Sequence, residues 1–158
     1  LIMGGPTKYY DYSTKNMKHI FSIFYKLLKK NDFQLVVIPS MRTPLNTIHY
    51  AKEFFGENHT VIMNVDKKAY LSALALSENI IVTCDSSSMI SEAALTGKPI
   101  YIANILPKKN DIRFQRFRNL FRELNITRNL GEDMENWSYQ SLDETNRVAN
   151  IIKKKINY

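Results

Sequence analysis

Short apolar runs alternate with amphipathic segments along most of the chain. The runs are apolar throughout, whereas the segments between them repeat apolar residues three and four positions apart, as at Met17, Ile20, Phe21 and Phe24. Continuous apolar runs predict strands buried on both faces of a parallel sheet, and the amphipathic segments predict helices that pack on it through one stripe. The expected strands are residues 1–3, 34–39, 60–65, 79–84 and 99–103.

Capping residues mark where the helices should begin and end. Ser13 is expected to cap a helix that runs to about Lys30, and Gly97, followed by Pro99, is expected to end a helix over residues 89–96. Ser141, with Glu144 three residues later, has the pattern of a capping box. The other expected helices cover residues 44–55, 69–76, 111–124 and 141–158.

The alternation of strands and helices predicts an α/β fold with a doubly wound parallel sheet of the Rossmann-like kind. With 158 residues, 44% of them hydrophobic, the chain has enough apolar material for one domain. We expect residues 1–158 to form that domain, with 141–158 as a C-terminal capping helix. Because the chain opens inside a buried strand, we also expect a fragment of a longer protein whose N-terminal domain is missing.

Charge and cysteine content narrow the partners and the compartment. The net charge of +7 suggests an anionic partner. No stretch approaches the roughly 20 apolar residues that cross a bilayer. The single cysteine, Cys84, lies in an apolar run and excludes an internal disulfide, so a reducing, cytoplasmic location is expected, with peripheral contact at the inner membrane surface as a further option.

The candidate ligand residues are those that follow the strands. Ligands of open α/β sheets bind beyond the carboxyl ends of the strands, near the point where strand order reverses. The residues at these positions are small, polar or cationic. They are Gly4, Gly5, Thr7, Lys8, Ser40, Arg42, Thr43, Asn64, Asp85, Ser86, Ser87, Ser88 and Met89.

The segment from Asp85 to Ala94 leaves a strand and opens a helix, whose first backbone N–H groups have no partner within the helix. These groups, the helix dipole and three serine hydroxyls predict a site for a diphosphate. The alternative is that the serines only cap the helix. Glu92, further along the helix, could accept hydrogen bonds from two ribose hydroxyls, or could be an exposed glutamate.

The remaining candidates each have an ordinary structural explanation as well. The two adjacent glycines, Gly4 and Gly5, let backbone approach a ligand, although a tight turn explains them equally. Lys8 and Arg42 could clamp phosphates, arginine through two parallel hydrogen bonds, or could be solvated surface charges.

Several function classes are excluded. No G-x-G-x-x-G follows the first strand and no acidic residue ends the second, which argues against a nicotinamide dinucleotide. The phosphate-loop signature of NTPases is absent, and the three histidines lack the spacing of a metal site, so neither a metal nor a cofactor is expected. No nucleophile, base and orienting acid can be assembled from the sequence.

A cluster of arginines lies in the segment 111–124, interleaved with aromatic and aliphatic residues. Helical spacing places most of the aromatics on one side, which predicts a helix packed on the core with a charged outer face. Contact with an anionic membrane surface is the alternative. Nucleic acid is not expected, because no recognised nucleic-acid-binding motif accompanies the charge. The arginines are Arg113, Arg116, Arg118 and Arg122.

Several of these segments resemble the mitochondrial-fission-factor family, which comprises a plant outer-membrane fission protein and bacterial homologues often labelled nucleoside-diphosphate-sugar epimerases. The resemblance spans nearly the whole chain, and its core is the Asp-Ser-x-Ser-Met-x-Ser-Glu-Ala motif at residues 85–93. Two positions depart from the family pattern: Met41 replaces a usual arginine, and residues 68–70 replace Asn-Pro-Tyr. The other similar segments are residues 4–9, 40–44, 82–84, 96–99 and 137–139, with Leu142, Glu144 and Thr145.

The resemblance implies that this chain is the C-terminal half of a GT-B-type protein with two Rossmann-like domains. Residues 86–89 would then meet the diphosphate of a nucleotide sugar, Glu92 the ribose, and Asn64 and Val65 the base. The implied activity is glycosyl transfer. The alternatives are epimerisation of the nucleotide sugar, or a non-catalytic, membrane-associated scaffold. Because a GT-B catalytic base usually comes from the other domain, the isolated domain is expected to bind without turnover.

Overall fold

A computed structural model describes residues 1–156 and contains one parallel sheet. The strand order is β3-β2-β1-β4-β5-β6, so the direction of winding reverses between β1 and β4. This confirms the doubly wound, Rossmann-like α/β fold. The strands are β1 (Ile2–Met3), β2 (Val36–Pro39), β3 (Thr60–Val61), β4 (Ile80–Thr83), β5 (Ile100–Ala103) and β6 (Thr127–Asn129).

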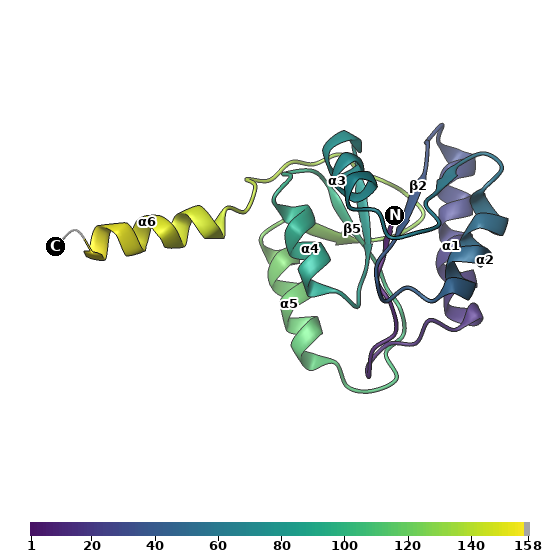
Figure 1. The fold of residues 1–158 in the computed structure, drawn as a ribbon, viewed down its shortest axis with the longest axis horizontal. Helices are drawn as coiled ribbons and strands as arrows, with labels where there is room; N and C mark the ends of the chain where they lie inside the picture. Colours follow the sequence, from purple (N-terminus) through teal and green to yellow (C-terminus); the bar gives the residue numbers. More distant parts are fainter. Residues whose placement is uncertain (157–158) are drawn as a thin grey trace.

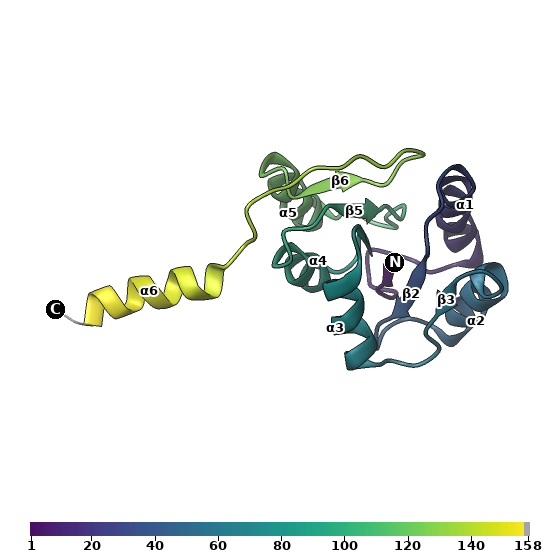
Figure 2. The same ribbon diagram turned by 90° about the horizontal axis from the view of Figure 1, so that it is seen from above.

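Helices cover both faces of the sheet. In the two views, α1 and α2 lie on one side, whereas α3, α4 and α5 lie on the other (Figures 1 and 2). Ser13 caps α1 as expected, because its side chain accepts the N–H of Asn16. The helices are α1 (Thr14–Lys30), α2 (Leu45–Phe55), α3 (Lys67–Leu76), α4 (Ser87–Ala94), α5 (Ile112–Glu123) and α6 (Glu144–Ile156).

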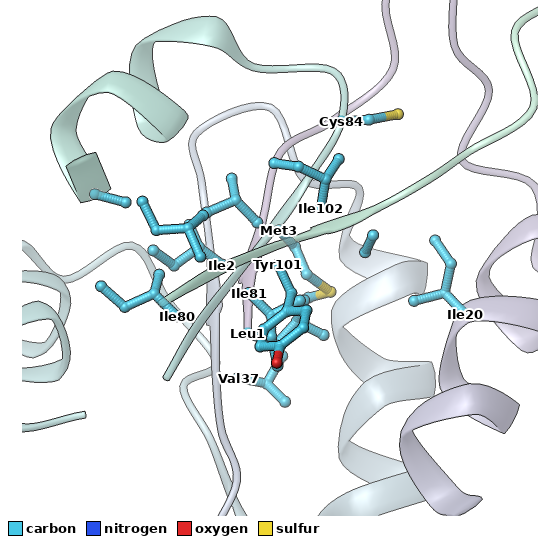
Figure 3. Close-up of a cluster of buried hydrophobic side chains, with 14 of the residues drawn as sticks. Leu1, Ile2, Met3, Ile20, Val37, Ile80, Ile81, Cys84, Tyr101 and Ile102 are labelled. Carbon is cyan, nitrogen blue, oxygen red and sulfur yellow. The ribbon is translucent and has the colours of Figure 1, made fainter. Parts of the chain in front are cut away.

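The hydrophobic core is centred on the middle strands. Figure 3 shows side chains of β1, β4 and β5 packed together, with Ile20 of α1 and Val37 of β2 beside them. Every residue of β4 and β5 is buried, which is why these strands are apolar without alternation. Burial of each large aliphatic side chain contributes about 1.5–3 kcal/mol, so this layer fixes the positions of the loops that follow the strands.

The sequence did not predict β6. This edge strand consists of Thr127, Arg128 and Asn129, and it pairs only with β5. A strand at the edge is held by backbone hydrogen bonds to one neighbour, so it needs no apolar run.

Two further elements differ from the predicted bounds. β3 is shorter than the expected 60–65, and α4 begins at Ser87 instead of Met89. Gly97 has a φ of 71° just beyond α4, as its place before Pro99 suggested.

The last helix begins later and lies elsewhere than the sequence suggested. Its first residue is Glu144, and the Asp143 carboxylate, not Ser141, accepts the N–H of Asn146 at 3.3 Å. None of its described residues is buried, and it projects away from the sheet instead of capping it (Figure 1). Residues 157 and 158, the end of the predicted segment, lie outside the described residues. Its exposed apolar stripe is formed by Val148, Ile151, Ile152 and Ile156.

Helix α5 packs on the core through its aromatic side, as expected. Phe121 is buried, and Phe114 and Phe117 pack against the core. Arg118 differs from the other arginines of the helix because it points inward, where it donates hydrogen bonds to the Asp111 carboxylate and to the backbone carbonyl of Cys84. Within residues 1–156, no helix is both long enough and apolar enough to cross a membrane.

Candidate functional site

The loops that follow β1, β2 and β4 are joined by one carboxylate, Asp85. Its side chain is 0% exposed. One oxygen accepts the N–H of Gly5 and a guanidinium N–H of Arg42, both at 3.0 Å, and the other accepts the Tyr12 hydroxyl at 2.5 Å. Burial, together with the adjacent carboxylate, raises the pKa of the Tyr12 phenol, which keeps it a donor. Asp85 therefore organises the carboxyl edge of the sheet from inside the protein.

The two glycines let these loops come close to one another. The N–H of Gly4 donates to the Thr83 hydroxyl at 2.8 Å, and that of Gly5 donates to Asp85, so both are occupied within the protein. A Cβ atom on Gly4 would lie 2.1 Å from the Asp85 carboxylate, and one on Gly5 would lie 2.0 Å from the Arg42 carbonyl oxygen. No side chain fits at either position.

The turn after β2 is also held by its own side chains. Thr43 is buried, and its hydroxyl accepts the N–H of Ser40 at 2.8 Å and lies 2.5 Å from the carbonyl oxygen of Gly4. In the β1 loop, the Thr7 hydroxyl accepts the N–H groups of Tyr9 and Tyr10, each at 3.1 Å. Ser40, Thr43 and Thr7 thus define the shape of the two loops.

Arg42 links the loops and still reaches solvent. Besides Asp85, its guanidinium donates to the carbonyl oxygen of Gly5 at 3.2 Å, and its side chain remains 43% exposed. A guanidinium carries five N–H groups, and these two bonds use only part of them. Arg42 can therefore hold the loops together and also present a positive charge at the surface.

The start of α4 has backbone donors without a described partner. Ser86 is buried and caps the helix, because its hydroxyl accepts the N–H of Met89 at 3.5 Å. Ser88 is exposed and Ser87 is half-buried. Within residues 1–156, the N–H groups of Ser87 and Ser88 donate to no acceptor. One serine thus has the capping role, and two free amides remain at the positive end of the helix dipole.

Glu92 lies on the exposed side of α4 beside α3. Its carboxylate accepts the Tyr70 hydroxyl at 2.6 Å. Burial and this hydrogen bond raise the pKa of the Tyr70 phenol, so Tyr70 donates at neutral pH. Only one oxygen of Glu92 has this partner, and the carboxylate retains capacity for further donors.

Three predicted residues are placed without a specific contact to this network. Lys8 is exposed, with its ammonium 4.9 Å from the centre of the Tyr9 ring. Asn64 is exposed beyond β3, and Met89 is half-buried and packs against the core. The structure thus brings Gly4, Gly5, Arg42 and Asp85 together, whereas Lys8 and Asn64 stand apart from that contact.

Tyr12 and Thr83 were not among the residues predicted for the site. A tyrosine nine residues after a strand and a threonine at the end of another carry no local signal, and only the tertiary structure brings them to Asp85 and Gly4. Tyr70 lies in the segment that departs from the family pattern, and its bond to Glu92 depends on how α3 packs beside α4.

Two cavities lie away from the predicted residues. One, of about 620 Å³, is apolar and lies at the amino ends of the strands, between α1 and α3. The other, of about 240 Å³, lies between α5 and the ends of β5 and β6. On α4, Ser88 and Glu92 are exposed and Ser87 is half-buried, and none of them lines either cavity. Such a surface can bind an extended anionic ligand along the sheet edge. Within residues 1–156, no cluster of three potential metal ligands is found.

Comparisons with known proteins agree with this architecture. The family model described as Mitochondrial fission ELM1 matches residues 1–156. An uncharacterized protein of Rickettsia prowazekii (strain Madrid E) is 30% identical over 163 residues, covering 97% of this chain and 45% of the relative. Mitochondrial fission protein ELM1 of Arabidopsis thaliana is 33% identical over 122 residues, covering 74% of this chain and 28% of the relative. The chain thus spans less than half the length of either relative.

Two solved structures have a similar fold. The UDP-GlcNAc 2-epimerase of Neisseria meningitidis, bound to UDP-GlcNAc, superposes with a TM-score of 0.52 at 16% identity, over 99% of this chain and 35% of the enzyme. The S. aureus MnaA structure with UDP gives a TM-score of 0.53 at 18% identity, over 99% of this chain and 44% of that protein. At these identities the likeness establishes a GT-B-like fold.

Proposed function

Because this chain belongs to the mitochondrial fission ELM1 family, which its match over residues 1–156 shows, we propose that it is the nucleotide-sugar-binding domain of a GT-B-like, glycosyltransferase-type protein. The observation that carries the proposal is the start of α4, where the N–H groups of the half-buried Ser87 and the exposed Ser88 donate to no described acceptor. Two structures of the same fold contain UDP-GlcNAc or UDP, which supports a ligand of this class.

In this proposal the diphosphate lies at the start of α4. Its oxygens accept the two free N–H groups, the helix dipole favours its negative charge, and the Ser88 hydroxyl adds a third donor. Arg42 contributes from the β2 loop, where its exposed part carries the positive charge nearest to Asp85. Lys8 adds long-range attraction from the β1 loop.

The nucleoside extends from the diphosphate along α4 toward α3. Glu92 accepts hydrogen bonds from the ribose hydroxyls, and Tyr70 holds its carboxylate in place from α3. The proposed base contacts come from Asn64 and Val65, which are exposed beyond β3 and directly precede Asp66, the cap of α3. Gly4, Gly5, Thr7, Ser40, Thr43, Asp85, Ser86 and Met89 complete the proposed site, mainly by fixing its loops and the helix start.

The chemistry of the whole protein follows from this binding mode. A diphosphate held by amides and cations is a stabilised leaving group, which favours cleavage of the bond between the sugar and the phosphate. Glycosyl transfer and epimerisation both begin with that cleavage. The fold shared with a UDP-GlcNAc 2-epimerase favours epimerisation as the second candidate. In either case the acid or base is supplied from outside this domain, and the domain alone binds without turnover.

The sharpest test uses Ser87→Pro. Ser87 is the first residue of α4, a position where proline is well tolerated, and the extended Ser86 (φ −124°, ψ 100°) suits a following proline. The substitution therefore removes one donor while keeping the helix. Loss of one hydrogen bond to a charged group, about 1.5–3 kcal/mol, should weaken binding of UDP and other nucleoside diphosphates by roughly ten- to a hundredfold in calorimetric titrations.

Glu92→Ala and Arg42→Ala should also weaken binding, and Glu53→Ala is the matched control. Glu53 is an exposed carboxylate on α2, on the opposite face of the sheet, so its loss should leave affinity unchanged. Nucleotide binding that is unaffected by Ser87→Pro, Glu92→Ala and Arg42→Ala would contradict the proposed site.

A non-catalytic role in membrane fission is a third candidate, favoured by the name of the Arabidopsis relative. It is distinguished by incubating the full-length protein with the nucleotide sugar that binds best. Release of nucleoside diphosphate, or scrambling of the sugar stereochemistry, would support the enzyme. Binding without either reaction, together with recruitment to vesicles that contain anionic lipid, would support the scaffold.

A further inference from the structure

The cavity of about 240 Å³ has an unusually basic lining. It lies between one face of α5 and the ends of β5 and β6. Three arginines, Arg118, Arg122 and Arg128, line it together with four carboxamide side chains, and no carboxylate does. Guanidinium and amide groups supply many hydrogen-bond donors, so the cavity is suited to a ligand that is rich in acceptors.

Internal ion pairs leave one of these positive charges uncompensated. Arg118 pairs with buried Asp111 at 3.0 Å, and Arg128 pairs with Glu135 while its guanidinium stacks 4.3 Å from the Trp137 ring centre. Within residues 1–156, Arg122 has no acidic partner and donates only to the Asn119 carboxamide oxygen, at 2.7 Å. The cavity therefore has a net positive charge centred on Arg122.

A hydroxyl on the strand side adds to this lining. Thr127 of β6 lines the cavity, and its hydroxyl can donate one hydrogen bond and accept others from an occupant.

From these features we propose that the cavity is a second ligand site that binds a phosphate group, either as the free ion or as a phosphomonoester. The volume is below the 300–1,000 Å³ or so of pockets for drug-sized ligands, which fits a small anion. The oxygens accept from Arg122 and the exposed part of the Arg118 guanidinium, and Thr127 provides one further hydrogen bond from the strand side.

This site is separate from the proposed nucleotide site. None of its lining residues belongs to the start of α4, and β6 is two strands away from β4 in the sheet, which is about 10 Å at the usual strand spacing. Because the two sites share no lining residue, both can be filled at the same time and their occupancies can be measured separately.

The test is a titration of the protein with inorganic phosphate and, separately, with methyl phosphate at constant ionic strength. Both Arg122→Gln and Thr127→Val are expected to fold, because Arg122 is exposed and valine has the shape of threonine. Arg122→Gln should weaken binding roughly ten- to a hundredfold, and Thr127→Val roughly three- to tenfold. The control Arg113→Gln changes an exposed arginine of the same helix outside the cavity and should bind as the wild type does.

The two ligands and a nucleotide distinguish the possible results. Tighter binding of methyl phosphate assigns the site to a phosphomonoester, and tighter binding of inorganic phosphate assigns it to the free ion. Saturating UDP should leave either affinity unchanged. Competition by UDP, an equal loss in Arg113→Gln, or the absence of saturable binding would overturn the proposal. None of these results depends on whether UDP binds at α4.

Discussion

Replacement of Asp85 tests the conclusion that this carboxylate supports the site from within. Asp85→Ala would leave the buried N–H of Gly5 without an acceptor, remove the charged acceptor from Tyr12, and free Arg42. An unpaired buried donor costs about 1–3 kcal/mol, and a lost hydrogen bond about 0.5–1.5 kcal/mol. Because the Arg42 side chain is 43% exposed and becomes hydrated again, the loss of its ion pair with Asp85 adds under about 1 kcal/mol. The expected destabilisation is therefore about 2–5 kcal/mol.

For a domain of this size, that corresponds to a fall in Tm of roughly 5–15 °C, measured by circular dichroism during heating. Asp85→Asn preserves the shape and one acceptor oxygen, so its Tm should fall by less than half as much. Glu57→Ala, which removes an exposed carboxylate without a described partner, is the control. If the Asp85→Ala variant melts within about 2 °C of this control, the supporting role of Asp85 is refuted.

Three further predictions concern the loops, the acidic range and α6. Gly5→Ala should lower the free energy of unfolding in urea by about 3 kcal/mol, because the new Cβ atom would lie 2.0 Å from the Arg42 carbonyl oxygen. Gly97→Ala has room, since its nearest neighbours lie at 3.7 Å, so only the strain of its positive φ should lower that free energy, by about 1 kcal/mol. Burial alone would raise the pKa of Asp111, but hydrogen bonds from Tyr10 and Arg118 outweigh it and hold the pKa below the ordinary value of 3.8. Its contribution to stability is thus complete above that value and is lost as the pH falls through the folded-state pKa. The difference in free energy of unfolding between wild type and Asp111→Asn should therefore be large at pH 6 and should become smaller as the pH falls below 3.8. A stop codon after Asp143 should leave the Tm within about 2 °C of wild type, because no described residue of α6 is buried, and a larger fall would show that α6 supports the core.

Helices and strands whose apolar residues reflect burial in the core could be predicted from the sequence. Strands such as β4 and β5 are apolar because both faces are covered, and α1 carries both its cap and its periodic stripe in the sequence. β6 could not be predicted, because an edge strand is selected by backbone pairing with β5 and Thr-Arg-Asn has no strand pattern. The position of α6 could not be predicted from the sequence either, because an amphipathic stripe shows that a helix has an apolar face but not what covers that face.

For the candidate site, the sequence indicated which loops lie at the carboxyl edge of the sheet, but not the contacts that each residue makes. The rule that ligands bind at the carboxyl edge led to loops that the structure brings together around Asp85, and the N–H groups of Ser87 and Ser88 at the start of α4 have no described acceptor. The assignment of individual contacts needed tertiary structure. The sequence cannot show that Asp85 is enclosed by Gly5, Tyr12 and Arg42, because these residues come from loops as far apart as 80 positions in the chain.

The most direct test of the proposed function is a titration of ¹⁵N-labelled protein with UDP, followed through the backbone amide resonances. The diphosphate should accept hydrogen bonds from the start of α4, so the largest saturable shifts should be those of Ser87 and Ser88, with smaller shifts near Glu92. Saturable binding that leaves the Ser87 and Ser88 amides unmoved would contradict the account.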